Sequence, residues 1–297
     1  MPRKKSSKSV AKRGTAAKRA SRAKRIDPTD GAVLRRRFAK CGIDAEMYET
    51  AASSLSRFLD ICSSLISGDE AYWFRGHADP AWRLVPSALR FDAEEKRLAA
   101  IEGVRDVQRV LSYKLPRPPA LTEQLNWLQI AQHYGYPTRL LDWTQNPVVA
   151  LYFACCGHQD SDGLVAVMRP AELNTQVKPD DPRLFSYEQD RDLIDGYIAL
   201  NAMEDKKRGK RTIAVVPSWD HERIFMQQGF FTLHGSRSFE LDAKQASSLT
   251  YIPVPKEFKQ SMILELSRVG MGEMFVYPEP EHACSHLRWQ KGLTGSE

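Results

Sequence analysis

Two uninterrupted apolar runs, GLVAVM at 163–168 and TIAVVP at 212–217, constrain the fold most strongly. Their β-branched residues favour extended backbone, and a strand that is apolar on both sides must be covered on both faces. The segment VVALYFACC at 148–156 is apolar on every side of a helix, which predicts a buried helix. We therefore expect a central sheet with helices packed against it.

The rest of the chain mixes helical and extended patterns without an internal repeat. Helices are predicted at 45–66, 93–113, 122–135 and 256–269, and further strands at 72–74, 138–143, 230–235 and 251–255. Asn146 is the expected N-cap of the buried helix, with Pro147 at its first position. The polar stretch 170–211 predicts a helical insertion and an exposed loop. The uneven order of elements indicates a single α+β domain over residues 29–297.

The positive charge of the chain is concentrated at its N-terminus. Residues 1–25 hold eleven Lys or Arg and no acidic residue, which leaves 32 basic against 37 acidic residues in the body, a net charge of −5. A segment of this composition cannot bury enough apolar surface to order itself, so residues 1–28 are predicted to be a disordered tail. The tail suits RNA or DNA phosphates, or it is only a solubilising extension. Its candidate nucleic-acid contacts are Lys4, Lys5, Lys12, Arg13, Lys18 and Arg19.

Several classes of protein are disfavoured by what the sequence lacks. No apolar run is long enough to span a membrane, and no apolar stretch follows the basic start as in a secretory signal. The five cysteines form no CxxC pair, which indicates reduced thiols in the cytoplasm. Neither GxGxxG, GxxxxGK[ST] nor GxSxG is present. HACSH at 282–286 is a weak metal motif, so no metal is expected, and Cys155 and Cys156 are interpreted as small core residues.

Three polar clusters interrupt otherwise apolar segments. They are Arg75-Gly76-His77 at the end of the predicted strand 72–74, His133 through Thr144, and Arg223 with Gln227. Each cluster is consistent with a core hydrogen-bond network, in which Arg75 pairs with Asp142, because a buried arginine needs a partner for its charge. For any single residue, the hydrogen-bond network is the preferred interpretation.

The stretches FRGH…WRLVPSALR, QHYGYPTRLLDWTQNPVVALYFA and RIFMQQGFF resemble the FRG domain family, which is named for its Phe-Arg-Gly motif. The resemblance extends over about residues 55 to 280. The order of these stretches is also similar, more distantly, to ADP-ribosyltransferases of the Arg-Ser-Glu type. That resemblance implies a split, mostly antiparallel sheet flanked by helices, with NAD bound as substrate in the cleft. The residues implied to contact NAD are Arg75, Gly76, Arg139 and Thr144.

The third stretch departs from the transferase pattern, which has a glutamate there. Gln227 stands at the corresponding place and Glu222 lies five residues earlier. Glutamine can hydrogen-bond the ribose hydroxyls but cannot act as a general base, so His133 or Asp142 is the alternative base. The catalytic candidates are therefore Gln227, Glu222, His133 and Asp142.

The resemblance implies transfer of ADP-ribose to a macromolecule, with nucleic acid delivered by the tail as one acceptor. In microbes such an activity serves as a toxin or a defence against phage, and it implies a neutralising partner protein. Hydrolysis of NAD without transfer uses the same cleft. The competing hypothesis is a non-catalytic module that binds a nucleotide or a nucleic acid.

Overall fold

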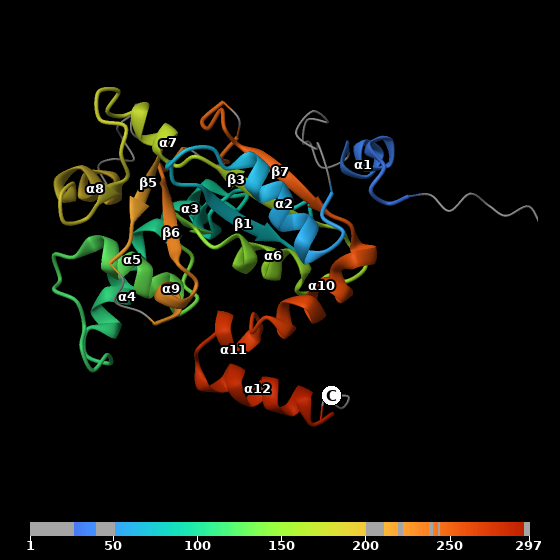
Figure 1. Cartoon of the computed structure of the whole chain (residues 1–297). Helices are drawn as coiled ribbons and strands as arrows, with labels where there is room; N and C mark the ends of the chain where they lie inside the picture. The colour runs from blue at the N-terminus through green and yellow to red at the C-terminus, as the bar shows by residue number, and fades with distance from the viewer. Residues whose placement is uncertain are drawn as a thin grey trace, which may run out of the picture.

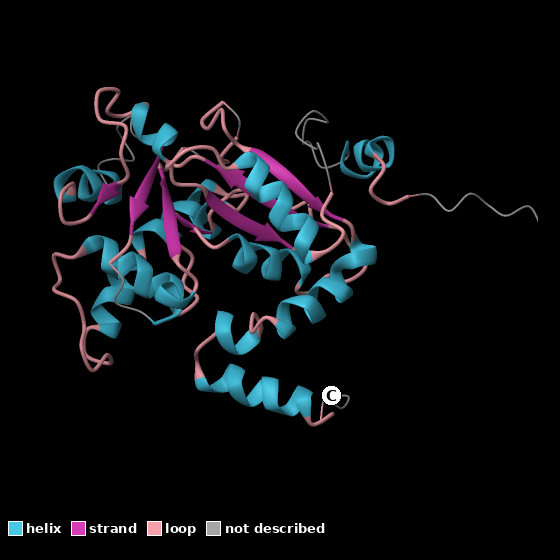
Figure 2. Cartoon of the chain, in the orientation of Figure 1, coloured by secondary structure: helices cyan, strands magenta, loops and turns pink. Residues whose placement is uncertain are grey.

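The structure is a computed structural model that describes residues 27–39, 51–199, 211–218, 222–237, 240–242 and 244–293. The tail residues 1–26, residues 45–50 of the first predicted helix and most of the loop before residue 211 lie outside the described residues. Figure 1 shows the order of the elements and Figure 2 their distribution. The strands are β1 (Trp73–His77), β2 (Leu140–Thr144), β3 (Gly163–Met168), β4 (Phe185–Ser186), β5 (Thr212–Val216), β6 (Gly229–His234) and β7 (Thr250–Val254).

Helices surround this sheet on both sides (Figure 2). They are α1 (Gly31–Phe38), α2 (Leu55–Leu65), the 3-10 helix η3 (Ser87–Leu89), α3 (Glu94–Glu102), α4 (Val104–Leu111), α5 (Gln124–His133), α6 (Pro147–Cys155), α7 (Ala171–Thr175), α8 (Arg191–Ile198), α9 (Glu222–Met226), α10 (Lys256–Arg268), α11 (Glu273–Val276) and α12 (Pro280–Gln290). Within the described residues, no helix is long and apolar enough to cross a membrane.

The seven strands form one mixed sheet in the order β4-β5-β6-β2-β1-β3-β7. Only the β4–β5 pair is parallel, and the other neighbours are antiparallel. This arrangement confirms the predicted α+β class and the mostly antiparallel sheet. β1 and β2 pair at one position, Phe74 with Thr144, whereas β1 pairs with β3 at five positions. The sheet therefore separates between β1 and β2, and we call this place the β1–β2 opening.

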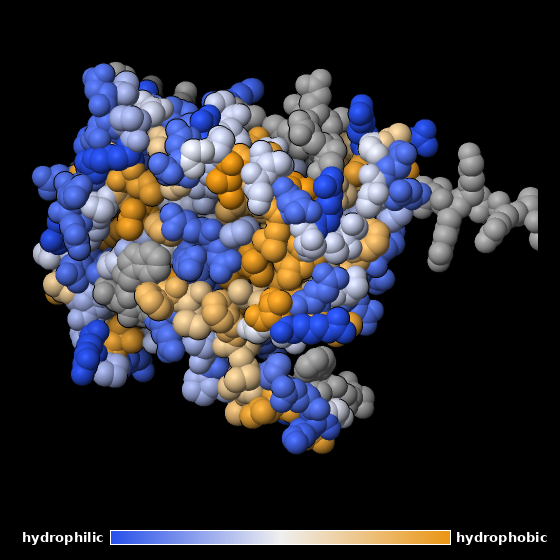
Figure 3. Space-filling view, in the orientation of Figure 1, coloured by the Kyte–Doolittle hydropathy of each residue, from blue (hydrophilic) through white to orange (hydrophobic). Residues whose placement is uncertain are grey.

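Alternating residues of β1 join two different cores. Phe74 packs with side chains of α2, α6 and α10, whereas Trp73 packs on the other face with Trp143, Met168 and Phe230. All six residues of β3 are buried, as its continuous apolar run predicts. On the face seen in Figure 3, hydrophobic side chains gather over the middle of the molecule, where α2, α6 and α10 lie in Figure 1. The helices α2, α6 and α10 therefore cover one face of the sheet, and a separate core lies on the other face.

Helix α6 lies unusually close to β1 and β3. A Cβ atom added to Gly76 would stand 1.9 Å from the carbonyl oxygen of Ala150, and one added to Gly163 would stand 2.3 Å from that of Ala154. Asn146 caps the helix through its side-chain oxygen, which accepts from Val148 N, and Pro147 occupies the first turn, as predicted. Two glycines and a cap thus fix the position of α6 on the sheet.

Several predicted boundaries differ from the structure. Strand β1 continues through Arg75 to His77, because these residues pair with β3. Residues 51–54 precede α2 without helical structure, so the first predicted helix begins only at Leu55. The helical region 93–113 consists of two helices that meet at Gly103. β2 begins two residues later than predicted, at Leu140.

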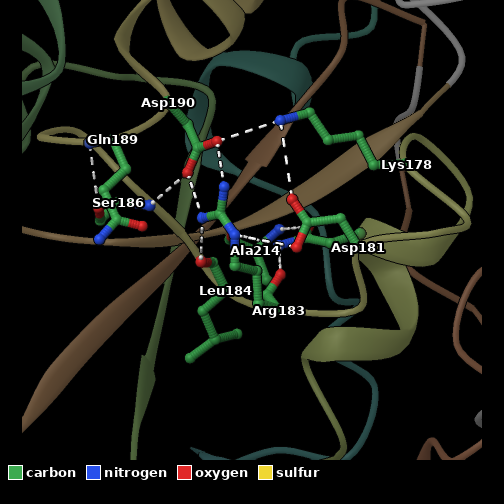
Figure 4. A network of polar contacts seen from close by, with 9 residues as sticks. Lys178, Asp181, Arg183, Leu184, Ser186, Gln189, Asp190 and Ala214 are labelled. Carbon is green, nitrogen blue, oxygen red and sulfur yellow. Dashed lines mark hydrogen bonds and ion pairs between the residues drawn. The ribbon is translucent and has the colours of Figure 1, made fainter.

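A buried carboxylate holds the insertion between β3 and β5 (Figure 4). Arg183 donates two hydrogen bonds to Asp190, of 2.6 and 2.8 Å, and Lys178 donates a third of 3.2 Å. The backbone nitrogen of Ser186 in β4 also donates to Asp190, at 3.2 Å. Burial raises the pKa of Asp190, but the hydrogen bonds and charges of Arg183 and Lys178 outweigh it and hold this pKa below its ordinary value.

A buried lysine anchors α10 to the loop that follows α6. Lys259 is fully buried, and its Nζ donates to the carbonyl oxygens of Ala78, Gly157 and His158 at 3.0–3.1 Å, with Ser161 O at 3.2 Å. These carbonyls satisfy the ammonium, which would otherwise be costly to bury. Lys259 therefore fixes the segment after β1 against residues 157–161.

Gly76→Ala is expected to lower the free energy of unfolding by about 2–3 kcal/mol, because the new Cβ overlaps the α6 backbone. The matched control is Gly31→Ala at the start of α1, since a Cβ added to Gly31 would have no atom within 4 Å. The control is expected to leave stability unchanged or to raise it by about 0.5–1 kcal/mol. Urea unfolding followed by circular dichroism measures both. Equal midpoints for the two variants would contradict the close packing of α6.

Asp190→Asn is expected to cost about 2 kcal/mol at neutral pH, because two charge-assisted partners lose their carboxylate. The folded pKa of Asp190 is lowered, so its contribution is present above the ordinary pKa of an aspartate and is lost as the pH falls through the folded pKa. The stability difference between wild type and variant should therefore shrink in acid. Asp180→Asn, an exposed change nearby, is the control. A difference that stays constant down to about pH 3 contradicts this explanation.

Candidate functional site

A cavity of about 280 Å³ lies at the β1–β2 opening. Its walls come from β1, β2, α5, α6, α9 and β6, so elements distant in the sequence meet there. The apolar part of the lining includes Phe74, Trp143, Val149, Phe153, Ile224 and Phe231. The polar side chains in the lining are Arg75, Gln129, Gln132, His133, Asp142, Thr144, Arg223 and Gln227. An apolar pocket with a few convergent polar groups is the usual form of a small-molecule site.

Arg75 is held in the cavity wall mainly by neutral acceptors. Its Nη1 donates to the backbone oxygen of Asp142 at 2.5 Å, and its Nε donates to His77 Nε2 at 3.1 Å. The nearest Asp142 carboxylate oxygen is 3.6 Å from Nη1, and that side chain is 59% exposed. Arg75 and Asp142 do lie together, as the core-network interpretation expects. The charged atoms are too far apart, and the Asp142 carboxylate is too exposed to water, for a buried ion pair.

His77 supports Arg75 as a neutral imidazole. The pKa of His77 is lowered to about 3, chiefly by burial and then by the charges of Arg75 and Arg90. A hydrogen bond with the backbone of Trp82 opposes these effects. Nε2 accepts from Arg75, so the proton of the neutral ring resides on Nδ1. The imidazole thus orients the guanidinium without neutralising it.

Thr144 ends β2 beside the start of α6. Its hydroxyl donates to the backbone oxygen of Gln227 at 2.5 Å and accepts from Asn146 N at 2.9 Å. The first bond ties β2 to the turn between α9 and β6, and the second joins it to the N-cap of α6. Gln228 in that turn has a φ of +47°, and its carbonyl accepts from Gln145 N. The α9 side of the cavity is therefore built on a constrained turn.

Helix α5 places three polar side chains along one side of the cavity. Gln132 Nε2 donates to Asp142 Oδ1 at 2.6 Å, and its Oε1 accepts from the Thr138 hydroxyl. Gln129 is buried, and its Nε2 has no hydrogen-bond partner among the described residues. Burial lowers the pKa of His133, and the charge of Arg223 lowers it further. At neutral pH this imidazole is a proton acceptor.

The C-terminal segment braces the α9 wall. Gln227 Nε2 donates to Val276 O at 2.8 Å, which fixes the plane of its amide. The Arg223 guanidinium lies 4.6 Å from the ring centre of Tyr277 and 3.7 Å from Glu279 Oε1. The cavity therefore depends on α11 and the residues after it, which the sequence patterns did not connect with the site.

Six of the eight catalytic and NAD-contact candidates line this cavity, and two lie elsewhere. The six are Arg75, Gly76, His133, Asp142, Thr144 and Gln227. Arg139 is buried outside it, where its guanidinium donates to the carbonyl oxygens of His234, Tyr197 and Ile198 at 2.8–3.2 Å. Burial lowers the pKa of Arg139 to about 10. Glu222 is exposed at the start of α9 and does not line the cavity.

The sequence patterns missed Gln129, Gln132 and the apolar Phe153. The available signal was the pair of glutamines on one side of the otherwise apolar helix 122–135, because a polar residue on a buried face needs a partner. The six candidate nucleic-acid contacts of the tail lie outside the described residues.

No cysteine is among the described residues that line the cavity. In the described part of the chain, no group of three or more His, Cys, Asp and Glu side chains is placed to hold a metal ion. His282 Nδ1 bonds with Glu273 Oε1 at 3.0 Å, and Cys284 is exposed on α12. Cys155 is buried as expected. Cys156 is exposed because it follows the last residue of α6, so the prediction that it belongs to the core is wrong.

Residues 70–163 match the FRG domain family. The chain contains an FRG domain. The matched region runs from just before β1 through α6 to the first residue of β3, so it carries Arg75, His133, Asp142 and Thr144. It is shorter than the expected 55–280, and Gln227 lies beyond it. Comparisons with curated proteins and with solved structures gave no match.

The FRG domain therefore supplies four of the six walls of the cavity, while α9 and β6 complete it from outside the matched region. A family assignment of this kind does not by itself assign an activity. The function has to be inferred from the side chains in the cavity.

The imidazole of His77 is expected to remain neutral, with its proton on Nδ1, from about pH 8 down to about pH 4. Its folded pKa is lowered, so its contribution to stability is present above the ordinary pKa of histidine and declines as the pH falls toward the folded value. NMR titration of ¹⁵N-labelled histidine side chains measures both tautomer and pKa. Protonation of His77 near the ordinary histidine pKa of about 6.5 contradicts the support of Arg75 by a neutral ring.

Proposed function

We propose that this protein is an ADP-ribosyltransferase that uses NAD as substrate, with Arg75 on the pyrophosphate. The observation that carries the proposal is the state of the Arg75 guanidinium. It is 19% exposed in the sheet opening, is oriented by a carbonyl oxygen and a neutral imidazole, and has its nearest carboxylate oxygen 3.6 Å away. Such a planar cation can give two parallel hydrogen bonds to a phosphate.

In the proposed reaction, the bond between ribose C1′ and the nicotinamide nitrogen breaks, and its electron pair leaves with neutral nicotinamide. A nucleophilic atom of the acceptor forms the new bond to C1′ and loses its proton to a base. Positive charge develops on the ribose in the transition state, so nearby oxygen acceptors lower the barrier. Gln227 suits this role, because its Nε2 is engaged by Val276 O and its side-chain oxygen remains as the acceptor.

His133 is the stronger of the two base candidates. Its pKa is lowered by burial and by Arg223, so the ring is neutral and ready to accept a proton at neutral pH. Asp142 is more exposed, and its carboxylate already accepts from Gln132. We assign the proton transfer to His133 and the placement of Arg75 to Asp142 through its backbone oxygen. Thr144 holds the Gln227 turn in place.

The acceptor of ADP-ribose is proposed to be a nucleic acid, delivered by the basic residues 1–25. An activity of this kind fits a microbial toxin or a phage-defence effector that works inside the cell and is restrained by a neutralising partner protein. These statements rest on analogy with transferases of the Arg-Ser-Glu type and on the charge of the tail.

A second function is favoured by one observation. Among the described residues that line the cavity, Asp142 is the only carboxylate, and the place of the expected glutamate is taken by Gln227. This composition suits a module that binds a nucleotide or nucleic acid without cleaving it.

Incubation with NAD labelled on its adenylate half separates these functions. RNA, single-stranded DNA, duplex DNA and cell protein are offered separately, with Arg75→Ala as the test variant and Arg57→Ala, an exposed change on α2, as its control. We expect label on one polymer with wild type and Arg57→Ala, and none with Arg75→Ala. Free ADP-ribose without labelled polymer indicates a hydrolase. Intact NAD with folded wild-type protein contradicts the enzyme and leaves the binding module.

His133→Asn is expected to reduce turnover of NAD by about 10²- to 10⁴-fold while leaving NAD binding within a few-fold of wild type. Wild-type turnover should rise with pH through a value below the ordinary pKa of histidine, since the pKa of His133 is lowered. The variant should lack that acid limb. His286→Asn, on α12, is the control. An unchanged pH profile in His133→Asn would falsify the assignment of the base.

A further inference from the structure

A second cavity adjoins the first at Arg75. It has a volume of about 780 Å³ and lies between the end of β1 and the segment 81–97. Arg75 lines both cavities, so the two spaces share its side chain as a common wall. The side chains that matter for its chemistry are Arg75, Trp82, Arg83, Arg90, Phe91 and Arg97, and we call this cavity the arginine basin.

The basin is strongly basic. Four arginines line it, and Asp92 is the only carboxylate among its described lining residues. Arg90 Nε donates to Val85 O at 2.8 Å, and Arg97 Nη1 donates to the carbonyl oxygens of Phe91 and Asp92 at 2.6 and 2.7 Å. These carbonyls orient the two guanidinium groups. Arg83 forms an ion pair with Glu240.

Arg75 and Arg90 line the same cavity, and their like charges repel each other. Burial lowers the pKa of Arg75, Asp142 opposes this effect, and the charge of Arg90 adds to it. The same Arg90 charge acts on His77, which lines the basin beside Arg75. Two like charges in a partly buried space are unfavourable in the free protein. An anion bound in the basin would relieve this repulsion.

Aromatic side chains stand at the rim of the same cavity. Trp82 is 49% exposed and Phe91 is 38% exposed, although both are large hydrophobic groups. The rings of Trp82 and His158 meet edge to face at a centroid distance of 5.0 Å, with the planes at 84°. His158 is fixed in turn by Lys259, which bonds its carbonyl oxygen. An exposed and braced indole beside arginines is the arrangement on which nucleobases stack.

We propose that the arginine basin binds a nucleoside 5′-phosphate, with its base stacked on Trp82 and its phosphate held by Arg90 and Arg75. The assignment of its source rests on the proposed function. If NAD is the substrate, the nucleotide is its adenylate half, and the cavity of about 280 Å³ beyond Arg75 takes the nicotinamide ribose. The other source of the same chemistry is one nucleotide of a single-stranded nucleic acid.

Isothermal titration calorimetry on the full chain tests this site without relying on turnover. The ligands are AMP, ADP-ribose, inorganic phosphate and a short oligothymidylate. The variants are Trp82→Ala and Arg90→Ala, with exposed controls Tyr113→Ala and Arg57→Ala. We expect AMP and ADP-ribose to bind wild type and both controls. Each test substitution should weaken their affinity by at least about tenfold. Binding of inorganic phosphate alone should be weaker in Arg90→Ala and unchanged in Trp82→Ala.

The outcomes distinguish the adenylate half of NAD from a nucleic acid strand as the ligand. They also distinguish failure of the proposed nucleotide site from failure of the proposed transferase. Binding of the oligonucleotide that weakens in Trp82→Ala, with no binding of AMP or ADP-ribose, assigns the basin to a nucleic acid strand. Contacts from the tail are the same in every variant, so only the difference between variants counts. AMP binding without any NAD cleavage supports nucleotide binding in the arginine basin and contradicts the transferase proposal. The proposal is overturned if folded wild type binds none of these ligands, or if Trp82→Ala and Arg90→Ala bind them like the controls.

Discussion

The close packing of α6 on β1 and β3 is the constraint on which the site depends. Gly76 and Gly163 leave no room for a side chain beneath the Ala150 and Ala154 carbonyls, so the helix axis can lie almost against the sheet. Since Asn146 caps that helix directly after β2, the end of β2 is fixed by the same contact. β1 and β2 then meet at one residue pair and diverge beyond it. The cavity lies where they diverge.

The electrostatics of the opening follow from this geometry. A strand interior that faced only apolar neighbours could not hold an arginine, but the opening lets Arg75 keep a water-accessible side. Its hydrogen bonds to a carbonyl and to a neutral His77 orient the guanidinium but bring no negative charge to compensate it. Arg139, just before the neighbouring strand, shows the opposite outcome, since three carbonyls engage its buried guanidinium. Arginine is therefore enclosed by backbone acceptors at position 139, whereas at position 75 it keeps an exposed side in the opening.

Much of the fold could be predicted from sequence because local patterns determined it. The buried strands β3 and β5, the apolar α6 and its Asn146 cap all follow from short runs of residues. The resemblance implied a split sheet, but local patterns could not place the opening between β1 and β2, because strand pairing joins segments far apart in the chain. Arg139 and Arg75 could not be told apart either, since the acceptors of Arg139 lie 58 and more residues away. Trp82 and Arg90 were visible in the WRLVPSALR motif, but only the fold places them beside Arg75.

Our interpretation places the guanidinium of Arg75 between the two halves of a bound dinucleotide. A crystal structure of the protein with ADP-ribose is the decisive test of this placement. We predict the pyrophosphate on Arg75, the adenine against Trp82 and the free ribose in the cavity lined by His133 and Gln227. Well-defined ADP-ribose bound elsewhere, with Arg75 still hydrogen-bonded only to Asp142 and His77, would contradict it.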